Sequence, residues 1–298
     1  MRQFRKTILQ LSLLVCFILV LVPKSFAETD VGNHKDIETL KAFIDSGIDY
    51  IKQYGAKKAY AEFSNSHGKF RQGDYYLYVY NYDGVCLAHG VHSEEKVGKN
   101  LYEGKDKYGT PYVKLMIELA KAGGGFINYY ARQPDTQAIG IKTAYVKPID
   151  DHTFIGGGIY KFIEMPTSYD VKVAELQAFV NTGVEYIKEH GEVEAFKEFN
   201  DPEGKFREGK LYFFVLDYNG TVFVEGADPE KYVGKNIYNL KDEYGTPFIK
   251  MCIETAKSGG GLMGYYWPEP VTGIIQFKIN YLKPLGNNKL IGAGFFEE

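Results

Sequence analysis

Two lysines, Lys142 and Lys278, could supply binding chemistry in this chain. They lie 136 positions apart, each inside a run of β-branched and aromatic residues typical of a strand. A lysine in a strand is usually solvated on an exposed face, but one that points into a pocket can bind a carboxylate through its ammonium group. The sequence leaves both alternatives open for each lysine.

Aromatic residues accompany both lysines. In the strand that begins at Tyr75, alternation places Leu77 and Val79 on one face and tyrosines on the other. A face rich in tyrosine hydroxyls could hold a small polar ligand, although aromatic residues also pack in strands without such a role. The predicted ligand-binding residues are Tyr78, Tyr80, His89, Tyr129, Arg132 and Lys142 in the first half of the chain, and Phe214, Tyr265, Trp267 and Lys278 in the second.

The two sets of candidates differ in charge and bulk. His89 could add a proton-dependent donor, whereas Glu225 at the equivalent position would repel a carboxylate. Trp267 gives the second set a large aromatic side chain where the first set has Ala131. In the first set Arg132, the next residue, could supply charge in place of that bulk. We therefore expect that the two sets do not bind the same ligand equally well. The sequence does not decide which of them binds.

Other patterns argue against catalysis and cofactors. Gly123 to Gly125 follow a predicted helix, whereas a phosphate cradle needs glycines before one. His89 and His92 have a metal-like spacing without patterned cysteine or carboxylate ligands. The sequence shows no nucleophile elbow and no cysteine or serine with a recognisable base. Asp106 and Asp242 lie in turns, where hydrogen bonds to the backbone are their ordinary role. We predict no enzyme activity, no cofactor and no metal.

The candidate residues belong to a duplicated unit. Residues 105–130 and 241–266 are identical at 16 of 26 positions. In the first copy Thr110 is expected to cap a helix, Pro111 suits its first turn, and Gly123 can take the left-handed conformation that ends it. A short helix that feeds a strand cannot fold alone, so its repetition indicates two copies of one domain.

Each copy predicts the same order of elements: a long helix, a short helix, two strands, a helix and three strands. Asp83-Gly84 and Asn219-Gly220 are hairpin-turn signals between the first two strands. Hairpin-linked strands indicate an α+β fold with a five-stranded antiparallel sheet. The first copy predicts helices at 36–54 and 57–63 and later strands at about 126–132, 139–147 and 154–160; the second predicts helices at 173–190 and 193–199, after a linker at 161–170.

The first 27 residues have the pattern of a secretory signal peptide. A positively charged start precedes the apolar run Ile8 to Val22, and small residues precede a cleavage site after Ala27. We expect cleavage and a periplasmic or secreted protein; the alternative is an uncleaved membrane anchor. Removal of this segment leaves 31 basic and 38 acidic residues, a net charge of −7 that argues against nucleic acid as a partner. Cys86 and Cys252 fall at non-equivalent positions, which favours unpaired thiols over a bridge between the copies.

An ordered set of short motifs runs through both copies. The first copy carries Asp83-Gly84, His89, Val97 to Asn100, Lys105-Asp106, Gly123 to Gly125, Tyr129-Tyr130, Lys142, Tyr145 to Pro148 and Ile155 to Tyr160; the second matches through Val233 to Asn236, Tyr265 to Trp267, Lys278 and Tyr281 to Pro284. This set resembles the Cache domain, in particular the single-Cache type. The resemblance covers nearly all of the chain after the predicted signal peptide.

The resemblance implies two tandem PAS-like domains, at residues 36–161 and 171–298, each with a long N-terminal helix against its sheet. The family senses small molecules outside the cell, often short organic acids, for chemoreceptors and histidine kinases. We therefore expect an exported, non-enzymatic protein that binds a small organic acid or amino acid and signals to a membrane-bound receptor or histidine kinase. The family's membrane span and cytoplasmic output domain are not expected here. The alternative is a structural or protein-interaction module without an open ligand pocket.

Overall fold

The computed structural model describes residues 34–161, 166–207 and 209–297 of the 298-residue chain. The predicted signal peptide lies outside these ranges. Within them, no helix is both long and apolar enough to cross a membrane.

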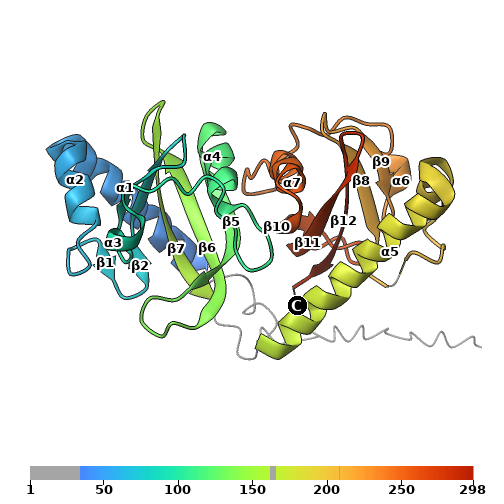
Figure 1. Cartoon of the computed structure of the whole chain (residues 1–298), viewed down its shortest axis with the longest axis horizontal. Coiled ribbons are helices and arrows are strands. Elements are labelled where there is room, and N and C mark those ends of the chain that lie inside the picture. Colours follow the sequence, from blue (N-terminus) through green and yellow to red (C-terminus); the bar gives the residue numbers. More distant parts are fainter. Residues whose placement is uncertain (1–33, 162–165, 208, 298) are drawn as a thin grey trace, which may run out of the picture. The chain divides into compact units, whose positions relative to one another are not determined.

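The first domain contains one five-stranded antiparallel sheet with helices around it (Figure 1). Its helices are α1 (His34–Tyr54), α2 (Ala56–Phe63), α3 (Ser93–Lys96) and α4 (Tyr112–Lys121). The sheet has the order β4 (Cys86–His89), β3 (Tyr78–Asn81), β7 (Thr153–Lys161), β6 (Ile139–Pro148) and β5 (Gly125–Arg132), and a separate pair is formed by β1 (Arg71–Gln72) and β2 (Tyr75–Tyr76).

The second domain repeats this architecture. Its helices are α5 (Pro166–Phe199), α6 (Pro229–Tyr232) and α7 (Phe248–Lys257). Its antiparallel sheet has the order β10 (Gly261–Pro268), β11 (Ile275–Gly286), β12 (Lys289–Phe296), β8 (Phe213–Asp217) and β9 (Val222–Glu225). Read from β9 to β10, this is the same strand order as in the first domain. The predicted α+β fold, with one five-stranded sheet in each copy, is confirmed.

The long helix α1 covers one face of the first sheet. Leu40 and Ile44 of α1 are fully buried in a cluster with Leu77, Val79 and Ile155. Complete burial of one aliphatic side chain stabilises a fold by about 1.5–3 kcal/mol, so this face is well held. The tyrosines that alternate with Leu77 and Val79 belong to a different cluster, as the alternation predicted. The opposite face of the sheet therefore remains for other contacts.

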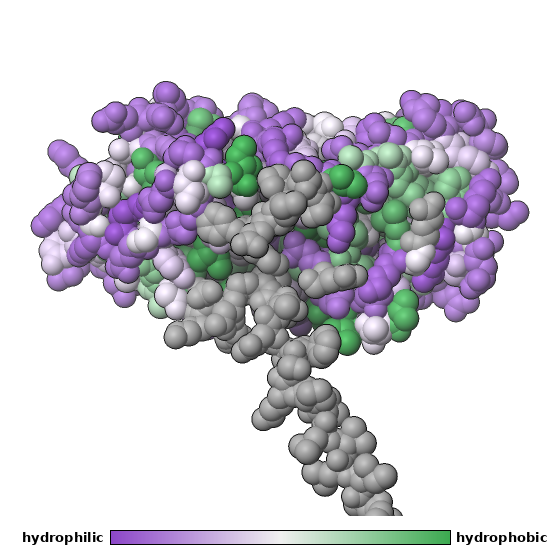
Figure 2. All heavy atoms as spheres, turned by 90° about the horizontal axis from the view of Figure 1, so that it is seen from below, coloured by the Kyte–Doolittle hydropathy of each residue, from purple (hydrophilic) through white to green (hydrophobic). Residues whose placement is uncertain are grey.

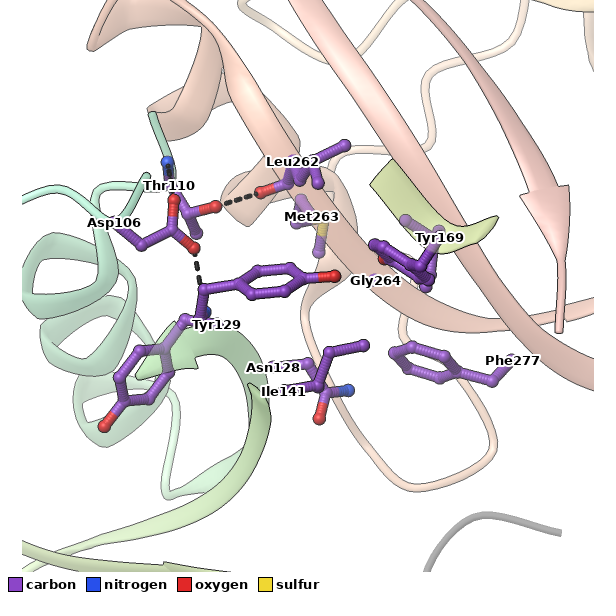
Figure 3. A pocket seen from close by; sticks show the side chains of 12 residues that line it. Asp106, Thr110, Asn128, Tyr129, Ile141, Tyr169, Leu262, Met263, Gly264 and Phe277 are labelled. Carbon is purple, nitrogen blue, oxygen red and sulfur yellow. Dashed lines mark hydrogen bonds between the residues drawn. The ribbon is translucent and has the colours of Figure 1, made fainter. Parts of the chain in front are cut away.

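Two local predictions are wrong. Thr110 does not cap α4: the residue before this helix is Pro111, no side chain caps it, and the Thr110 hydroxyl instead donates to the carbonyl oxygen of Leu262 at 2.9 Å (Figure 3). The predicted linker is also shorter than expected, because α5 begins at Pro166. Helix α5 continues to Phe199 through Gly191, whose φ of 78° breaks the helical geometry where the long helix was predicted to end.

The cysteines behave as predicted. Cys86 and Cys252 are both buried and free. Burial raises the pKa of the Cys86 thiol to about 11 and that of Cys252 to about 12. Both side chains therefore act as small apolar groups in the core rather than as nucleophiles.

The surface carries scattered apolar groups. The face shown in Figure 2 is largely hydrophilic, with hydrophobic side chains in small separate groups. Among exposed apolar residues, Val193 and Val271 are the most accessible, at 89% and 76%. Single exposed apolar residues are normal on a folded protein and do not define a site.

Candidate functional site

A cavity of about 280 Å³ lies in the first domain, on the side of the sheet away from α1. Strands β3, β4, β5 and β7 contribute to its wall, together with α3, α4 and the segment between them. Six tyrosines from strands line it: Tyr76 of β2, and Tyr78, Tyr80, Tyr129, Tyr130 and Tyr160 of the five-stranded sheet. Its volume is close to the lower end of the range for small-molecule sites, which suits a compact ligand.

His89, at the end of β4, presents a hydrogen-bond donor to the cavity. Its Nδ1 accepts the backbone N–H groups of Val91 and His92, at 3.4 and 3.1 Å. Burial, and then the positive charges of Lys96 and Lys142, hold the pKa of His89 well below its usual value, so the ring is neutral. A neutral imidazole carries one N–H hydrogen, and since Nδ1 is an acceptor this hydrogen is on Nε2.

Lys96 of α3 places a second donor beside the first. Its Nζ lies 3.4 Å from Nε2 of His89. Because Nε2 carries a hydrogen, it cannot accept one from the ammonium group. Burial lowers the pKa of Lys96, and the acidic neighbour Glu95 offsets this only in part. The Glu95 side chain is 75% exposed and lies against His92. Lys96 and His89 thus present two donors to one position for which the described residues supply no acceptor.

Lys142 lies behind the cavity wall rather than in it. It is fully buried, and its ammonium group donates to the hydroxyl oxygen of Tyr76 at 2.6 Å. The same ammonium lies 4.0 Å from the ring centroid of Tyr76 and 5.2 and 5.3 Å from those of Tyr78 and Tyr160. Burial, with the charge of Lys96 as a smaller cause, lowers the pKa of Lys142 well below its usual value. Neither lysine predicted from the sequence is solvated, since Lys278 is also buried.

A glycine allows Lys142 to take this path. A Cβ atom at Gly158 of β7 would lie 2.4 Å from Cε of Lys142, which is far inside van der Waals contact. The aliphatic part of the lysine therefore lies flat against the backbone of β7. The tip of the side chain is in this way fixed beneath the tyrosines.

Asp106 lines the cavity but is not available to a ligand. Its Oδ1 accepts the backbone N–H groups of Tyr108 and Thr110, both at 2.9 Å. Its Oδ2 accepts that of Tyr130 at 2.9 Å (Figure 3). The carboxylate therefore holds the turn before α4 against β5. This is the structural role that the sequence indicated.

The equivalent place in the second domain is almost filled. A void of about 20 Å³ remains there, room for one water molecule. Phe214, Tyr265 and Trp267 line it together with Glu225. Lys278 is buried behind these residues, with its Nζ 3.9 Å from the ring centroid of Tyr212.

The structure thus separates the predicted residues into two groups. Tyr78, Tyr80, His89, Tyr129 and Arg132 line the open cavity of the first domain, and Lys142 lies directly behind it. Phe214, Tyr265 and Trp267 of the second domain line a space too small for an organic molecule, and Lys278 lies behind it. Lys96 was missed. Its spacing of four from His92, one helical turn, was the available signal.

These features define the class of the molecule: two PAS-like α+β domains, one of them with a polar cavity on the sheet face away from its long helix. The chain belongs to the Single Cache domain 2 family, whose model matches residues 37–161 and 202–298. Cache domains are sensor domains, and the catalytic part of the kinase described next is outside the matched region.

Three similar proteins illustrate the relationship. The sensor histidine kinase MctS of Rhizobium johnstonii is 37% identical over 86 residues, which are 28% of this chain and 18% of that protein, so the chain matches a small part of its length. A methyl-accepting chemotaxis protein of Vibrio parahaemolyticus is 27% identical, with a TM-score of 0.39 over 43% of this chain and 90% of that structure. A Cache chemosensory domain described for carboxylic acid recognition is 21% identical, with a TM-score of 0.38 over 44% of this chain and 96% of that structure.

Proposed function

We propose that this protein is an extracytoplasmic sensor that binds a small organic acid in the cavity of its first domain. The binding is non-enzymatic, and occupancy is passed to a membrane-bound receptor or histidine kinase. The signal-peptide pattern of the sequence and membership of a sensor family support the location and the role.

The observation that carries the proposal is the pair of adjacent donors. Lys96 Nζ and His89 Nε2 lie 3.4 Å apart, and both need an acceptor. A carboxylate offers two oxygens on one carbon, so it can accept from both nitrogens at once and neutralise the lysine. A buried donor without a partner destabilises a protein by about 1–3 kcal/mol, and this energy is recovered when a ligand supplies the acceptor.

The charges around the cavity favour an organic acid over an amino acid. An amino acid also carries an ammonium group, which needs an anionic or carbonyl partner. Of the two carboxylates in the lining, Asp106 is engaged by three backbone N–H groups and Glu95 is mostly exposed. The tyrosine hydroxyls then serve as partners for hydroxyl or keto groups of the acid.

The proposed partner, a membrane-bound receptor or histidine kinase, is suggested by the kind of protein to which part of this chain is similar. The chain shares an 86-residue stretch with a sensor histidine kinase at 37% identity. A ligand that closes the cavity around Lys96 would change the equilibrium between conformations of α3 and its neighbours, and a partner that binds one conformation better would detect the change. The alternative is an interaction module whose cavity never takes a ligand.

The proposal is tested by calorimetric titration with a panel of short carboxylic acids and amino acids, at constant pH and with ionic strength matched by sodium chloride. We expect at least one organic acid to bind with one site per chain. Lys96→Met should weaken it by about 30-fold or more, since loss of one partner of a buried charge pair typically costs about 2–5 kcal/mol. Lys99→Met, three residues further on and exposed, is the matched control and should bind normally. A panel without binding would favour the interaction module, and equal affinity in the Lys96 variant would show that the ligand does not bind at the donor pair.

A further inference from the structure

The buried lysines of the two domains occupy the same place in their sheets. Lys142 pairs with Tyr129 on one side and Tyr160 on the other. Lys278 pairs in the same way with Tyr265 and Phe296. The two lysines can therefore be compared residue by residue through their neighbours.

What faces the lysine differs between the domains. His89 is opposite Tyr78 in the register of the first sheet, and Glu225 is opposite Phe214 in that of the second. Glu225 thus stands where the first domain has its neutral histidine donor. It is buried, and one of its oxygens, Oε1, has no hydrogen-bond partner within the described part of the chain.

The charge of Lys278 acts on this carboxyl group across the filled space, because within the described residues the two side chains form no direct hydrogen bond or ion pair. Burial raises the pKa of Glu225, and Lys278 is the largest influence that lowers it again. In return, Glu225 is the largest influence that offsets the effect of burial on the pKa of Lys278. In the first domain Lys142 has no such carboxyl neighbour, and the charge that acts on it is the like charge of Lys96.

The remaining space is closed by larger side chains. Trp267 takes the place of Ala131, and its indole lies 5.6 Å from the ring of Tyr232 and 5.4 Å from that of Phe248. Tyr232 itself replaces Lys96, so the second domain also lacks the lysine of the donor pair. About 20 Å³ remains, against about 280 Å³ in the first domain.

We propose that Glu225 is a resident counterion, which supplies to the second domain the carboxylate that the first domain takes from its ligand. The second domain is then permanently filled and takes up no small carboxylate, and the chain has one anion site. By occupying the second site, Glu225 leaves the first domain as the one that binds the ligand. The inference rests on the proposed function for its description of the first cavity, but its test does not.

The test removes the carboxylate of Glu225 and asks whether free acetate can take its place. All variants carry Lys96→Met, which disables the proposed site of the first domain. Glu225→Ala removes a CH₂–COO⁻ group, for which acetate is the matching probe. We expect Glu225→Ala to lower Tm, and acetate, compared with chloride at equal ionic strength and pH, to raise it by about 2–4 °C for each kcal/mol of binding linkage. Adding Lys278→Met should remove the acetate effect. An acetate effect that equals that of chloride, or that is as large in the parent with Glu225 intact, would overturn the inference.

A second variant covers the case in which Glu225→Ala does not fold. Glu225→Gln keeps the shape and removes the charge. Burial raises the pKa of Glu225 to about 7 and lowers that of Lys278 to about 8, so between these pH values, where both groups carry charge, the variant should melt below the parent. Lys278→Met added to it should restore part of the loss, because no buried ammonium is then left without its counterion. A Glu225→Gln chain as stable as the parent would overturn the inference. Failure of the carboxylic acid panel on the unaltered chain would instead count against the proposed function alone.

Discussion

Lys142 donates a hydrogen bond of 2.6 Å to the hydroxyl oxygen of Tyr76, and both side chains are buried. The Tyr76 hydroxyl also lies 3.1 Å from that of Tyr160, and both tyrosines line the cavity. Because the lysine occupies an oxygen lone pair, the Tyr76 hydrogen must point elsewhere, and the positive charge makes it a stronger donor. We therefore propose that the lysine acts on a bound ligand through Tyr76 and not by direct contact.

Lys142→Met should stabilise the ligand-free protein. Within the described residues the buried ammonium has one hydrogen bond, to a neutral hydroxyl, which is unfavourable. An apolar residue of similar length removes that penalty, by about 1–4 kcal/mol. The pKa of Lys142 is lowered on folding, so the unfolded chain binds the proton more strongly and the stability of the native sequence rises with pH. The gain in Tm from the substitution should accordingly shrink towards alkaline pH. An equal or lower Tm at neutral pH would contradict this account; Lys121→Met, on the surface of α4, is the control.

Ligand binding should take up protons. Burial lowers the pKa values of Lys96 and His89 in the free protein, and a carboxylate placed between them raises both. Titration calorimetry in buffers of different ionisation enthalpy should show an observed enthalpy that increases with the buffer's own. Affinity should then fall as the pH rises. A slope of zero or below would exclude a carboxylate bound at this pair.

Ala131→Trp should block the cavity without harming the fold. The second domain accommodates a tryptophan at the equivalent Trp267, where it packs against Tyr232 and Phe248. The same side chain at position 131 would fill space that a ligand needs, so binding should be lost while Tm stays equal or rises. The reciprocal change, Trp267→Ala, should not create binding while Glu225 is present. Retained affinity in the Ala131 variant would place the ligand elsewhere.

Asp106→Asn should destabilise the chain more than the matched change Asp242→Asn. Both carboxylates accept two N–H groups at one oxygen, but the third bond is 2.9 Å at Asp106 and 3.4 Å at Asp242. An asparagine turns an NH₂ group towards that third N–H, which loses a buried hydrogen bond and typically costs about 1–3 kcal/mol. Urea unfolding of the two variants measures the difference. Equal effects would mean that the contact to β5 contributes little.

Much of the fold could be predicted because it depends on local patterns. Alternation in the strand after Tyr75 placed Leu77 and Val79 against the long helix, and the clusters confirm this. The hairpin signal at Asp83-Gly84 and the duplication predicted the order of helices and strands along each copy. The α4 cap was predicted wrongly because Thr110 has a competing partner, the carbonyl of Leu262, which lies 152 residues away and which no local pattern reveals.

The candidate site was only partly predictable for a similar reason. The sequence left open whether Lys142 is solvated or points into the pocket. It cannot say that the side chain stops behind Tyr76, because its depth depends on how the strands pack. Lys96 lies on a helix of four residues whose position is set by the chain before and after it. The tautomer of His89 depends on two backbone N–H groups that only the bend after β4 brings to Nδ1.

Gly158 supports the buried lysine independently of the residues at the cavity rim. The aliphatic stem of Lys142 lies against bare main chain at Gly158, and the hydroxyl of Tyr76 holds the ammonium group at its tip. Replacements of rim residues such as His92 or Arg132 can therefore alter which acid is preferred while the buried charge of Lys142 keeps its position.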